Sequence, residues 1–410
     1  MTSFTDALSI IRTALADGRT LAESVPLVLA NGRTLAERVI AGETIPAADN
    51  SALDGYAVRA ADIADASPAS PVTLRLIGEA PAGRPFSGTI DSGEAIGIMT
   101  GGMIPTGADT VVEIEVCHAD ASSVRIAAQR TAGHGIRRRG EDVEEGREIL
   151  SPGKRLIPGD IGLLAALGAA SVVVRTKPTV GILATGNELV EFNRRPEAGQ
   201  IRNSSTPALY AACLDAGAEP IDLGIVGDDP KEIAEAIEEG LRYDILLTTG
   251  GVSAGRYDYV QHVFPELGVT PLFHKVAVKP GKPILFGIRH DPTGSCAVFG
   301  LPGNPVSTMV TFAQFVRPAI GLLLGEDAAP VRLRARLLDP IAKKEGFRHF
   351  VRGRLGRDEK GEAVVSTTGT QSSGAISSMS RANGLIILDE ESRGLDAGAM
   401  VEVELLGIHT

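Results

Sequence analysis

The sequence predicts an α/β plus β fold: a central three-layer α/β domain with a parallel-rich sheet, a small β-rich domain and a C-terminal β-barrel domain. Residues 178–325 alternate apolar strand-like runs with helical patterns, which is typical of a parallel sheet covered by helices on both faces. Residues 41–142 and 326–410 instead contain short β-rich runs separated by Gly, Pro and Asp. A chain of 410 residues is also longer than one compact core accommodates.

The N-terminal region carries two helical patterns, at residues 4–17 and 27–39. The apolar positions of the first pattern recur at spacings of three and four, as one buried helix face requires. The longest uncharged run, residues 161–174, is too short to cross a bilayer and predicts a buried helix followed by a strand. We expect residues 1–40 and 143–177 to form one helical linking region.

The predicted α/β domain has apolar runs that each end at a Gly-containing loop: residues 180–184, 221–226, 245–248 and 297–299. Helical patterns follow at residues 206–216, 230–242, 257–266 and 305–324. Ligands of parallel sheets bind beyond the carboxyl ends of the strands, so we expect the functional residues in the loops after these runs. Further β-rich runs between residues 331 and 405 predict the small barrel.

Composition narrows the possible partners. Lys and Arg number 40 against 51 Asp and Glu, and the net charge of −11 argues against nucleic acid or an anionic membrane as a partner. The first residues lack the basic-then-apolar layout of a secretion signal. Cys117, Cys213 and Cys296 form no CxxC pair, so a reducing, cytoplasmic location is expected. A metal in such a protein should be a hard cation on carboxylates, such as Mg²⁺.

Two glycine-containing loops are candidate anion sites. The third predicted strand runs into a loop whose backbone amides and hydroxyls suit an anion, with Thr249, Gly250, Gly251, Ser253 and Gly255 as the candidate ligands. The fourth ends in Pro302, Gly303 and Asn304, where Asn304 is placed as a helix N-cap and the first helical amides face the same edge. A flexible turn and a well-capped helix are the structural alternatives. Neither loop matches a Walker A or GxGxxG motif, so ordinary NTPases and nicotinamide dehydrogenases lose support.

Three lysines form a candidate cationic edge. In a strand, Lys275 and Lys279 would share a face, and Lys282 follows in a turn flanked by prolines. Their charges suit the oxygens of phosphate or molybdate. The alternative is an edge strand that lysines protect from pairing with other chains.

Carboxylates also follow the predicted strands. Glu188 comes after the first strand, Asp228 after the second, and Asp258 after the Gly-rich loop. Each alone suits a turn or an N-cap, but together they predict a magnesium site opposite the phosphate-binding lysines. Residues 49–58 and 137–142 are two further polar patches, and from their composition we expect exposed loops there.

The motifs in order resemble the MoeA family of molybdopterin molybdenumtransferases, to which the E domains of gephyrin and of its plant counterpart are related. They are NSALDGYAV at 50–58, TGGMIP at 100–105, GAD at 107–109, RRRGED at 137–142, TGNEL at 185–189, GQIRN at 199–203, TTGGVSAG at 248–255, KPGKP at 279–283 and LPGNPVS at 301–307. Carried over by motif, the functional residues of the family fall on Asp54, Thr100, Asp142, Glu188, Asp228, Asp258, Lys275 and Lys279. In the last domain, Arg352 and Ser373 match its basic and hydroxyl positions.

The resemblance implies a homodimer that inserts molybdate into adenylyl-molybdopterin with the help of Mg²⁺ and releases AMP and molybdenum cofactor. The adenylated pterin nucleotide would come from a separate molybdopterin adenylyltransferase, because no such domain is fused here. Two alternatives stay open at this stage: a non-enzymatic scaffold like the gephyrin E domain, and an enzyme that prefers tungstate. A lone adenylyltransferase would explain only residues 178–325.

Overall fold

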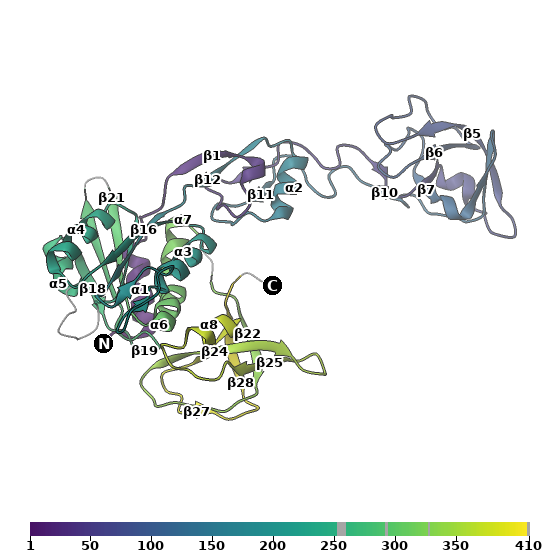
Figure 1. Cartoon of the computed structure of the whole chain (residues 1–410). Helices are drawn as coiled ribbons and strands as arrows, with labels where there is room; N and C mark the ends of the chain where they lie inside the picture. Colours follow the sequence, from purple (N-terminus) through teal and green to yellow (C-terminus); the bar gives the residue numbers. More distant parts are fainter. Residues whose placement is uncertain (252–259, 292–293, 327–328, 408–410) are drawn as a thin grey trace. The chain divides into compact units, whose positions relative to one another are not determined.

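The computed structural model describes residues 1–251, 260–291, 294–326 and 329–407 (Figure 1). The chain forms two compact units. The large unit consists of Met1–Ala36, Pro152–Ile161 and Ala170–Thr410, and the small unit of Glu37–Ser151 and Gly162–Ala169. Each unit has its own sheets and its own core. The domain boundaries expected from the sequence remain predictions.

A six-stranded mixed sheet is the centre of the large unit, with the strand order β16-β13-β17-β21-β20-β18. Its strands are β13 Thr179–Thr185, β16 Glu219–Val226, β17 Ile245–Thr249, β18 Thr270–His274, β20 Leu285–Asp291 and β21 Gly294–Leu301. The first four in spatial order are parallel, β20 runs antiparallel to them, and β18, antiparallel to β20, has the same direction as the first four. The predicted parallel-rich sheet is therefore confirmed.

Helices cover both faces of this sheet. The helices are α1 Phe4–Ala14, α3 Ser205–Asp215, α4 Pro230–Gly240, α5 Val260–Glu266, α6 Pro305–Thr311 and α7 Arg317–Leu324. Side chains of α1, α3, α6 and α7 share a core with Ile245 and Leu247 of β17, whereas those of α4 and α5 pack with Leu246. This alternation along β17 is what a strand buried on both faces requires, and it produces the predicted three layers.

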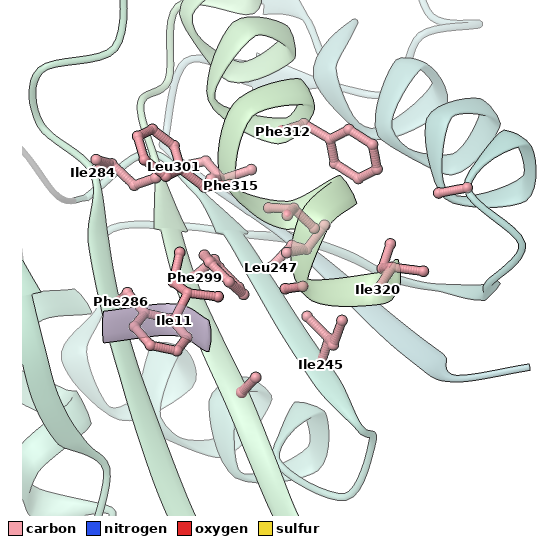
Figure 2. Close-up of a cluster of buried hydrophobic side chains, with 14 of the residues drawn as sticks. Ile11, Ile245, Leu247, Ile284, Phe286, Phe299, Leu301, Phe312, Phe315 and Ile320 are labelled. Atoms are coloured by element: carbon pink, nitrogen blue, oxygen red, sulfur yellow. The ribbon is translucent and has the colours of Figure 1, made fainter. Parts of the chain in front are cut away.

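The segment Pro305–Leu324 is the longest apolar helical stretch, and a π-helical turn at Phe312–Val316 joins α6 to α7. By length and composition alone it could cross a membrane, but 67% of its most apolar window is buried inside the protein. Phe312, Phe315 and Ile320 lie in the same core as Leu247 and Phe299 (Figure 2). This burial identifies the segment as a core helix of the α/β layer.

The C-terminal strands form a barrel. They are β22 Arg332–Leu337, β24 Arg348–Arg357, β25 Ala363–Thr367, β26 Gly384–Leu388 and β28 Met400–Leu405. The sheet closes because β24 pairs with both β25 and β26, and the short strand β19 Val278–Lys279 adds to β24 from outside. Helix α8 Ile376–Arg381 and the pair β23 Ile341–Ala342 with β27 Gly394–Leu395 complete this part. The predicted C-terminal barrel is confirmed.

The small unit is built on a second six-stranded sheet, ordered β7-β4-β6-β5-β9-β8. Its strands are β4 Gly55–Val58, β5 Val72–Ala80, β6 Glu94–Ile98, β7 Thr110–Glu113, β8 Cys117–Ala119 and β9 Ser123–Ile126. Two short pairs precede and follow it in the chain: β2 Val39–Ile40 with β11 Glu148–Leu150, and β3 Asn50–Ser51 with β10 Ile136–Arg137. The predicted β-rich domain is thus confirmed in its class.

Two expectations for the linking region were wrong. The helical pattern at 27–39 forms only a short 3₁₀ helix at Leu27–Leu29, because the chain turns at Gly32 with a φ of 75° and then bonds to the backbone of Lys154 and Leu156. The preceding strand, β1 Ala22–Pro26, pairs with β12 Ser171–Arg175. Helix α2 Pro158–Ala166 forms as predicted but is only partly buried: Leu164 is buried, Ile161 and Leu163 are half-buried, and the two alanines at its end are exposed.

Candidate functional site

The candidate site of the large unit begins where parallel strands end. Strand β13 ends at Thr185, and the following loop is tied to the loop after β16. The amide of Asn187 donates to the carboxylate of Asp228 at 3.4 Å, and the amide of Asp228 donates to Oδ1 of Asn187 at 3.1 Å. The amide of Gly186 also donates to the Val226 carbonyl at 3.0 Å. The structure therefore brings the two predicted acidic loops together, through a side chain, Asn187, to which the sequence analysis gave no role.

Glu188 folds back over the same loop. A Cβ placed on Gly186 would lie 2.6 Å from Oε2 of Glu188, so the carboxylate sits directly against the backbone of Gly186. In the described part of the chain, neither Glu188 nor Asp228 forms an ion pair with Lys, Arg or His. Two neighbouring acidic loops without a basic partner are suited to a hard divalent cation.

The metal prediction is tested only in part by this geometry. Among the described residues, no group of three or more His, Cys, Asp or Glu side chains could hold a metal ion. The third predicted ligand, Asp258, lies outside the described residues. Glu188 and Asp228 supply oxygen ligands of the kind that Mg²⁺ takes, and this ion commonly completes its shell with water and substrate phosphate. The donor set therefore fits Mg²⁺ with few protein ligands.

The glycine loops of β17 and β21 cross at the same end of the sheet. Gly250 has a φ of 93°, and its amide donates to the Leu301 carbonyl at 3.1 Å. A Cβ on Gly250 would lie 2.7 Å from the Thr185 carbonyl oxygen, and one on Gly303 would lie 3.6 Å from Cα of Gly250. The end of β13 and the loops after β17 and β21 therefore contact one another, and the Thr185 hydroxyl also donates to the Thr249 carbonyl at 3.3 Å. Thr249 is the last residue of β17 and Gly251 follows two residues later, whereas Ser253 and Gly255 lie outside the described residues.

The loop after β21 leads into helix α6, and a loop from the barrel meets it there. Asn304 is the N-cap residue of α6, as predicted, although its side chain makes no capping hydrogen bond. The first N–H of the helix, that of Val306, donates to the Ser373 carbonyl at 3.2 Å. The Thr308 hydroxyl donates to the Pro302 carbonyl at 2.6 Å. Pro302, Asn304 and Ser373 are thus neighbours at one helix start.

Arg352 lies beneath that barrel loop. Its side chain is only 1% exposed, and its guanidinium donates to Oγ of Ser378 at 3.0 Å and to the carbonyls of Thr370 and Ser372 at 3.3 and 3.0 Å. No carboxylate within the described ranges pairs with it, and burial lowers the pKa of the guanidinium. Arg352 therefore holds the loop that carries Ser373 and places a positive charge under it. Its predicted contact with substrate remains a prediction.

The lysine segment does not form the single strand that the sequence pattern predicted. Strand β18 ends at His274, Lys275 has a φ of 68°, and β19 begins only at Val278 and belongs to the barrel sheet. The reversal at Lys275 breaks the alternation of side chains, so the two lysines are not two positions on one strand face. Lys275 is half-buried, whereas Lys279 and Lys282 are exposed.

The three lysines are nevertheless placed beside the barrel and α6. Val278–Lys279 pairs with Arg348 and His349, and burial together with the charges of Lys279 and Lys343 lowers the pKa of His349 to about 4. Nζ of Lys282 is 5.7 Å from the centre of the Phe347 ring. Gly281, with a φ of 111°, packs so closely on Thr311 of α6 that a Cβ would collide with it. His349 was not predicted as part of this cluster, and no local motif indicates it.

The small unit contains the remaining predicted residues. The amide and the hydroxyl of Thr100 donate to Oδ1 of Asp54 at 2.7 and 2.8 Å, and these two bonds lower the pKa of the Asp54 carboxyl. Asp142 is exposed, and its amide donates to the Ile45 carbonyl at 3.2 Å. Asp54 and Thr100 are thus a contacting pair, and within the small unit no hydrogen bond among the described residues links Asp142 to them.

The polar patches around these residues are only partly loops. In the first, Gly55–Val58 forms strand β4. In the second, the Arg138 guanidinium binds the Asp49 carboxylate at 2.6 Å, and the Arg139 amide donates to the same group at 2.8 Å. The bond from the Arg139 amide and then that from Arg138 lower the pKa of Asp49. The two patches are therefore tied to each other rather than independent exposed loops.

Known proteins show the same organisation. Residues 2–168 match the MoeA N-terminal region (domains I and II), residues 181–321 a probable molybdopterin-binding domain, and residues 334–406 the MoeA C-terminal region (domain IV). A molybdopterin molybdenumtransferase of Bacillus subtilis is 38% identical over 90% of this chain and 86% of its own length, and one from Synechococcus elongatus is 37% identical over 98% and 99%. The crystal structure of the molybdopterin biosynthesis MoeA protein of Pyrococcus horikoshii OT3 superposes with a TM-score of 0.84 at 32% identity, covering 99% of this chain and 100% of that one. On this identity and coverage, the chain belongs to the MoeA family of molybdopterin molybdenumtransferases, the transferases of molybdenum cofactor biosynthesis.

Proposed function

We propose that this transferase inserts molybdate into adenylyl-molybdopterin with the help of Mg²⁺, releasing AMP and molybdenum cofactor. The observation that carries the proposal is the arrangement at the strand ends, where Glu188 and Asp228 without a basic partner lie beside crossing glycine loops. Cleavage of a phosphoanhydride has two requirements. One is a set of acidic groups that hold a divalent cation, and the other is a backbone that a phosphate can approach.

The residues of the chain have distinct roles in this proposal. Lys275, Lys279 and Lys282 neutralise the oxygens of phosphate and molybdate, and Gly250 lets the end of β13 pack against the loop after β17. Glu188 and Asp228, with Asp258 as the third acid, would hold Mg²⁺, which would supply Lewis-acid chemistry when bound. The protein thus positions and neutralises charge rather than supplying a nucleophile.

The proposed reaction balances without a further co-reactant. Two sulfurs of the pterin replace one oxygen of molybdate, which leaves as water together with the thiol protons. Cleavage of the phosphoanhydride consumes one water and releases AMP. The sulfur ligands come from the substrate, and the three cysteines of the chain are free and buried, with thiol pKa values raised to about 12 by burial.

We also propose that the protein acts as a cytoplasmic homodimer that receives its pterin nucleotide from a separate molybdopterin adenylyltransferase. In the large unit, Leu21, Val28, Leu29 and Ile157 are 79%, 82%, 67% and 55% exposed. Leu21 directly precedes β1, and Val28 and Leu29 follow it closely. Ile157 follows Leu156, whose amide donates to the Arg33 carbonyl at 2.9 Å. Such an exposed apolar group is typical of a surface that another subunit covers. Sedimentation equilibrium of the wild type and of Val28→Lys tests this point.

The catalytic proposal is tested by AMP release from adenylyl-molybdopterin in the presence of molybdate, with Mg²⁺ varied. Asp228→Asn and Glu188→Gln keep side-chain size but remove the charge, so we expect both to lose Mg²⁺-dependent turnover. Asp229→Asn is the matched control: Asp229 is the neighbouring residue and caps α4 through the amides of Lys231 and Glu232, a bond that Asn also accepts. Unchanged Mg²⁺ dependence in Asp228→Asn and Glu188→Gln would contradict the proposed metal site.

A further inference from the structure

Lys275 has a backbone conformation that its own side chain disfavours. Its φ of 68° is the only positive φ among the non-glycine residues that the structure describes. A side chain with a Cβ pays a steric penalty there, and such conformations persist where neighbouring contacts impose them. The neighbouring contacts of Lys275 therefore fix its backbone and the direction in which its side chain leaves the backbone.

The first residues of the chain provide part of these contacts. The amide of Thr2 donates to the Lys275 carbonyl at 3.0 Å, and the amide of Ala277 donates to the Thr2 carbonyl at 2.9 Å. Thr2 thereby forms a parallel β-bridge with Val276. On the other side, the amide of Arg348 in β24 donates to the Ala277 carbonyl at 2.8 Å. Residues 275–277 are thus hydrogen-bonded to Thr2 on one side and to the barrel on the other.

Thr2 is itself held firmly by the residues that follow it. Ser3 is the N-cap of α1, and its hydroxyl accepts the amide of Asp6 at 3.1 Å. Phe4 is only 3% exposed, and its ring lies 5.6 Å from that of Phe315 and 5.4 Å from that of Phe350. The Arg348 guanidinium stacks over the Phe4 ring at 4.9 Å. Because Phe4 contacts both the α/β core and β24, Thr2 has a defined position relative to both.

We infer that residues Thr2–Phe4 are a positioning element of the active site, which holds Lys275 and, through β19, Lys279 where they bind an anion. The inference rests on the proposed function, in which these lysines bind phosphate or molybdate oxygens. It adds that an N-terminal segment, outside every motif of the family resemblance, determines the placement of the lysines. The segment acts through backbone hydrogen bonds, so its effect depends on the Thr2 amide and not on the Thr2 side chain.

The Thr2 amide can be removed without shortening the chain. Thr2→Pro eliminates the N–H that bonds to Lys275, whereas the matched control Thr2→Ala keeps both backbone bonds. We expect Thr2→Pro to raise the KM for molybdate about 3- to 10-fold, the effect of losing roughly one hydrogen bond, with kcat nearly unchanged. Amides of residues 275–282 should exchange faster with deuterium in Thr2→Pro only. Thr2→Ala should match the wild type in both measurements.

A double-mutant cycle separates positioning from general destabilisation. If Thr2 acts through the ammonium groups of Lys275 and Lys279, Thr2→Pro has no further effect on the KM for molybdate in a background that carries both Lys275→Ala and Lys279→Ala. Additive losses, or an unchanged KM in Thr2→Pro, would overturn the inference. An unchanged KM in Lys275→Ala would instead refute the anion-binding role of Lys275 and with it the proposed function at this residue. Should Thr2→Pro fail to fold, Phe4→Leu loosens the same anchor and is subject to the same cycle.

Discussion

Both the backbone conformation of Gly250 and its close neighbours restrict this position to glycine. Its φ of 93° lies in the region that favours glycine, and a Cβ would lie 2.7 Å from the Thr185 carbonyl oxygen and 3.0 Å from the Thr185 hydroxyl oxygen. Both atoms belong to the end of β13, one residue before the loop that carries Asn187 and Glu188. Gly250→Ala should therefore disturb the fold and the proposed metal site through one added methyl group.

The expected loss of stability has two parts. The left-handed backbone costs a residue with a Cβ about 1–2 kcal/mol, and forcing apart well-packed atoms costs about 1–3 kcal/mol more. Gly268 is the control, because its φ is 77° but a Cβ there would meet nothing within 4 Å. Gly268→Ala should thus lose only the backbone part, about 1–2 kcal/mol. The difference in unfolding free energy between Gly250→Ala and Gly268→Ala measures the steric cost of the close contact between Gly250 and Thr185.

Urea unfolding followed by circular dichroism gives the loss of unfolding free energy for each variant from the shift of its midpoint. This requires that the dependence of the free energy on urea concentration is the same in both variants. AMP release should fall strongly in Gly250→Ala and stay near the wild-type rate in Gly268→Ala. If both variants lose the same stability and keep the same activity, the close approach of Gly250 to Thr185 is not a feature of the folded protein, and the crossing of the loops would have to be abandoned.

Two further predictions concern the barrel. The His349 pKa of about 4 lies below its ordinary 6.5, so the unfolded chain binds more protons between these values and the free energy of unfolding falls as pH drops through that window. His349→Asn should flatten this part of the urea-midpoint profile by roughly 1 kcal/mol after allowance for solvent screening, and an unchanged slope would disprove the burial of the imidazole. Arg352→Lys loses the fork that holds three acceptors, so we expect a loss of about 1–3 kcal/mol and weaker molybdate binding by calorimetry. Normal binding in a destabilised Arg352→Lys would restrict this residue to a structural role.

The α/β layer was predictable because its information is local. Each strand of the parallel sheet is a short apolar run, each helix has its own apolar spacing, and Asn304 with Pro305 marks a helix start by side-chain chemistry alone. The positions of Glu188 and Asp228 at one edge follow from the same topology, since parallel strands place their carboxyl ends together. The hydrogen bonds between these two loops were not predicted. Asn187, a polar residue shortly after the end of a strand, is the sequence feature that could have indicated them.

The predictions that were wrong or missing share a different cause: these features depend on contacts with residues that are far away in the sequence. The pattern at 27–39 has helical spacing, yet its backbone bonds to Lys154 and Leu156. Lys275–Lys279 alternates like a strand, yet Thr2 on one side and β24 on the other bend it at Lys275. The burial of Arg352 and the low pKa of His349 likewise arise from residues that no short window contains.

The sequence by itself therefore determined the fold class and the order of the loops that carry acids, glycines and lysines, because apolar periodicity and turn chemistry act between near neighbours. The family followed from the resemblance of its motifs and from the matching family models. Only the tertiary structure decided which side chains are buried, which loops touch, and how the N-terminal residues hold Lys275. Those properties depend on contacts between segments far apart in the chain, and such contacts exist only after the whole core has formed.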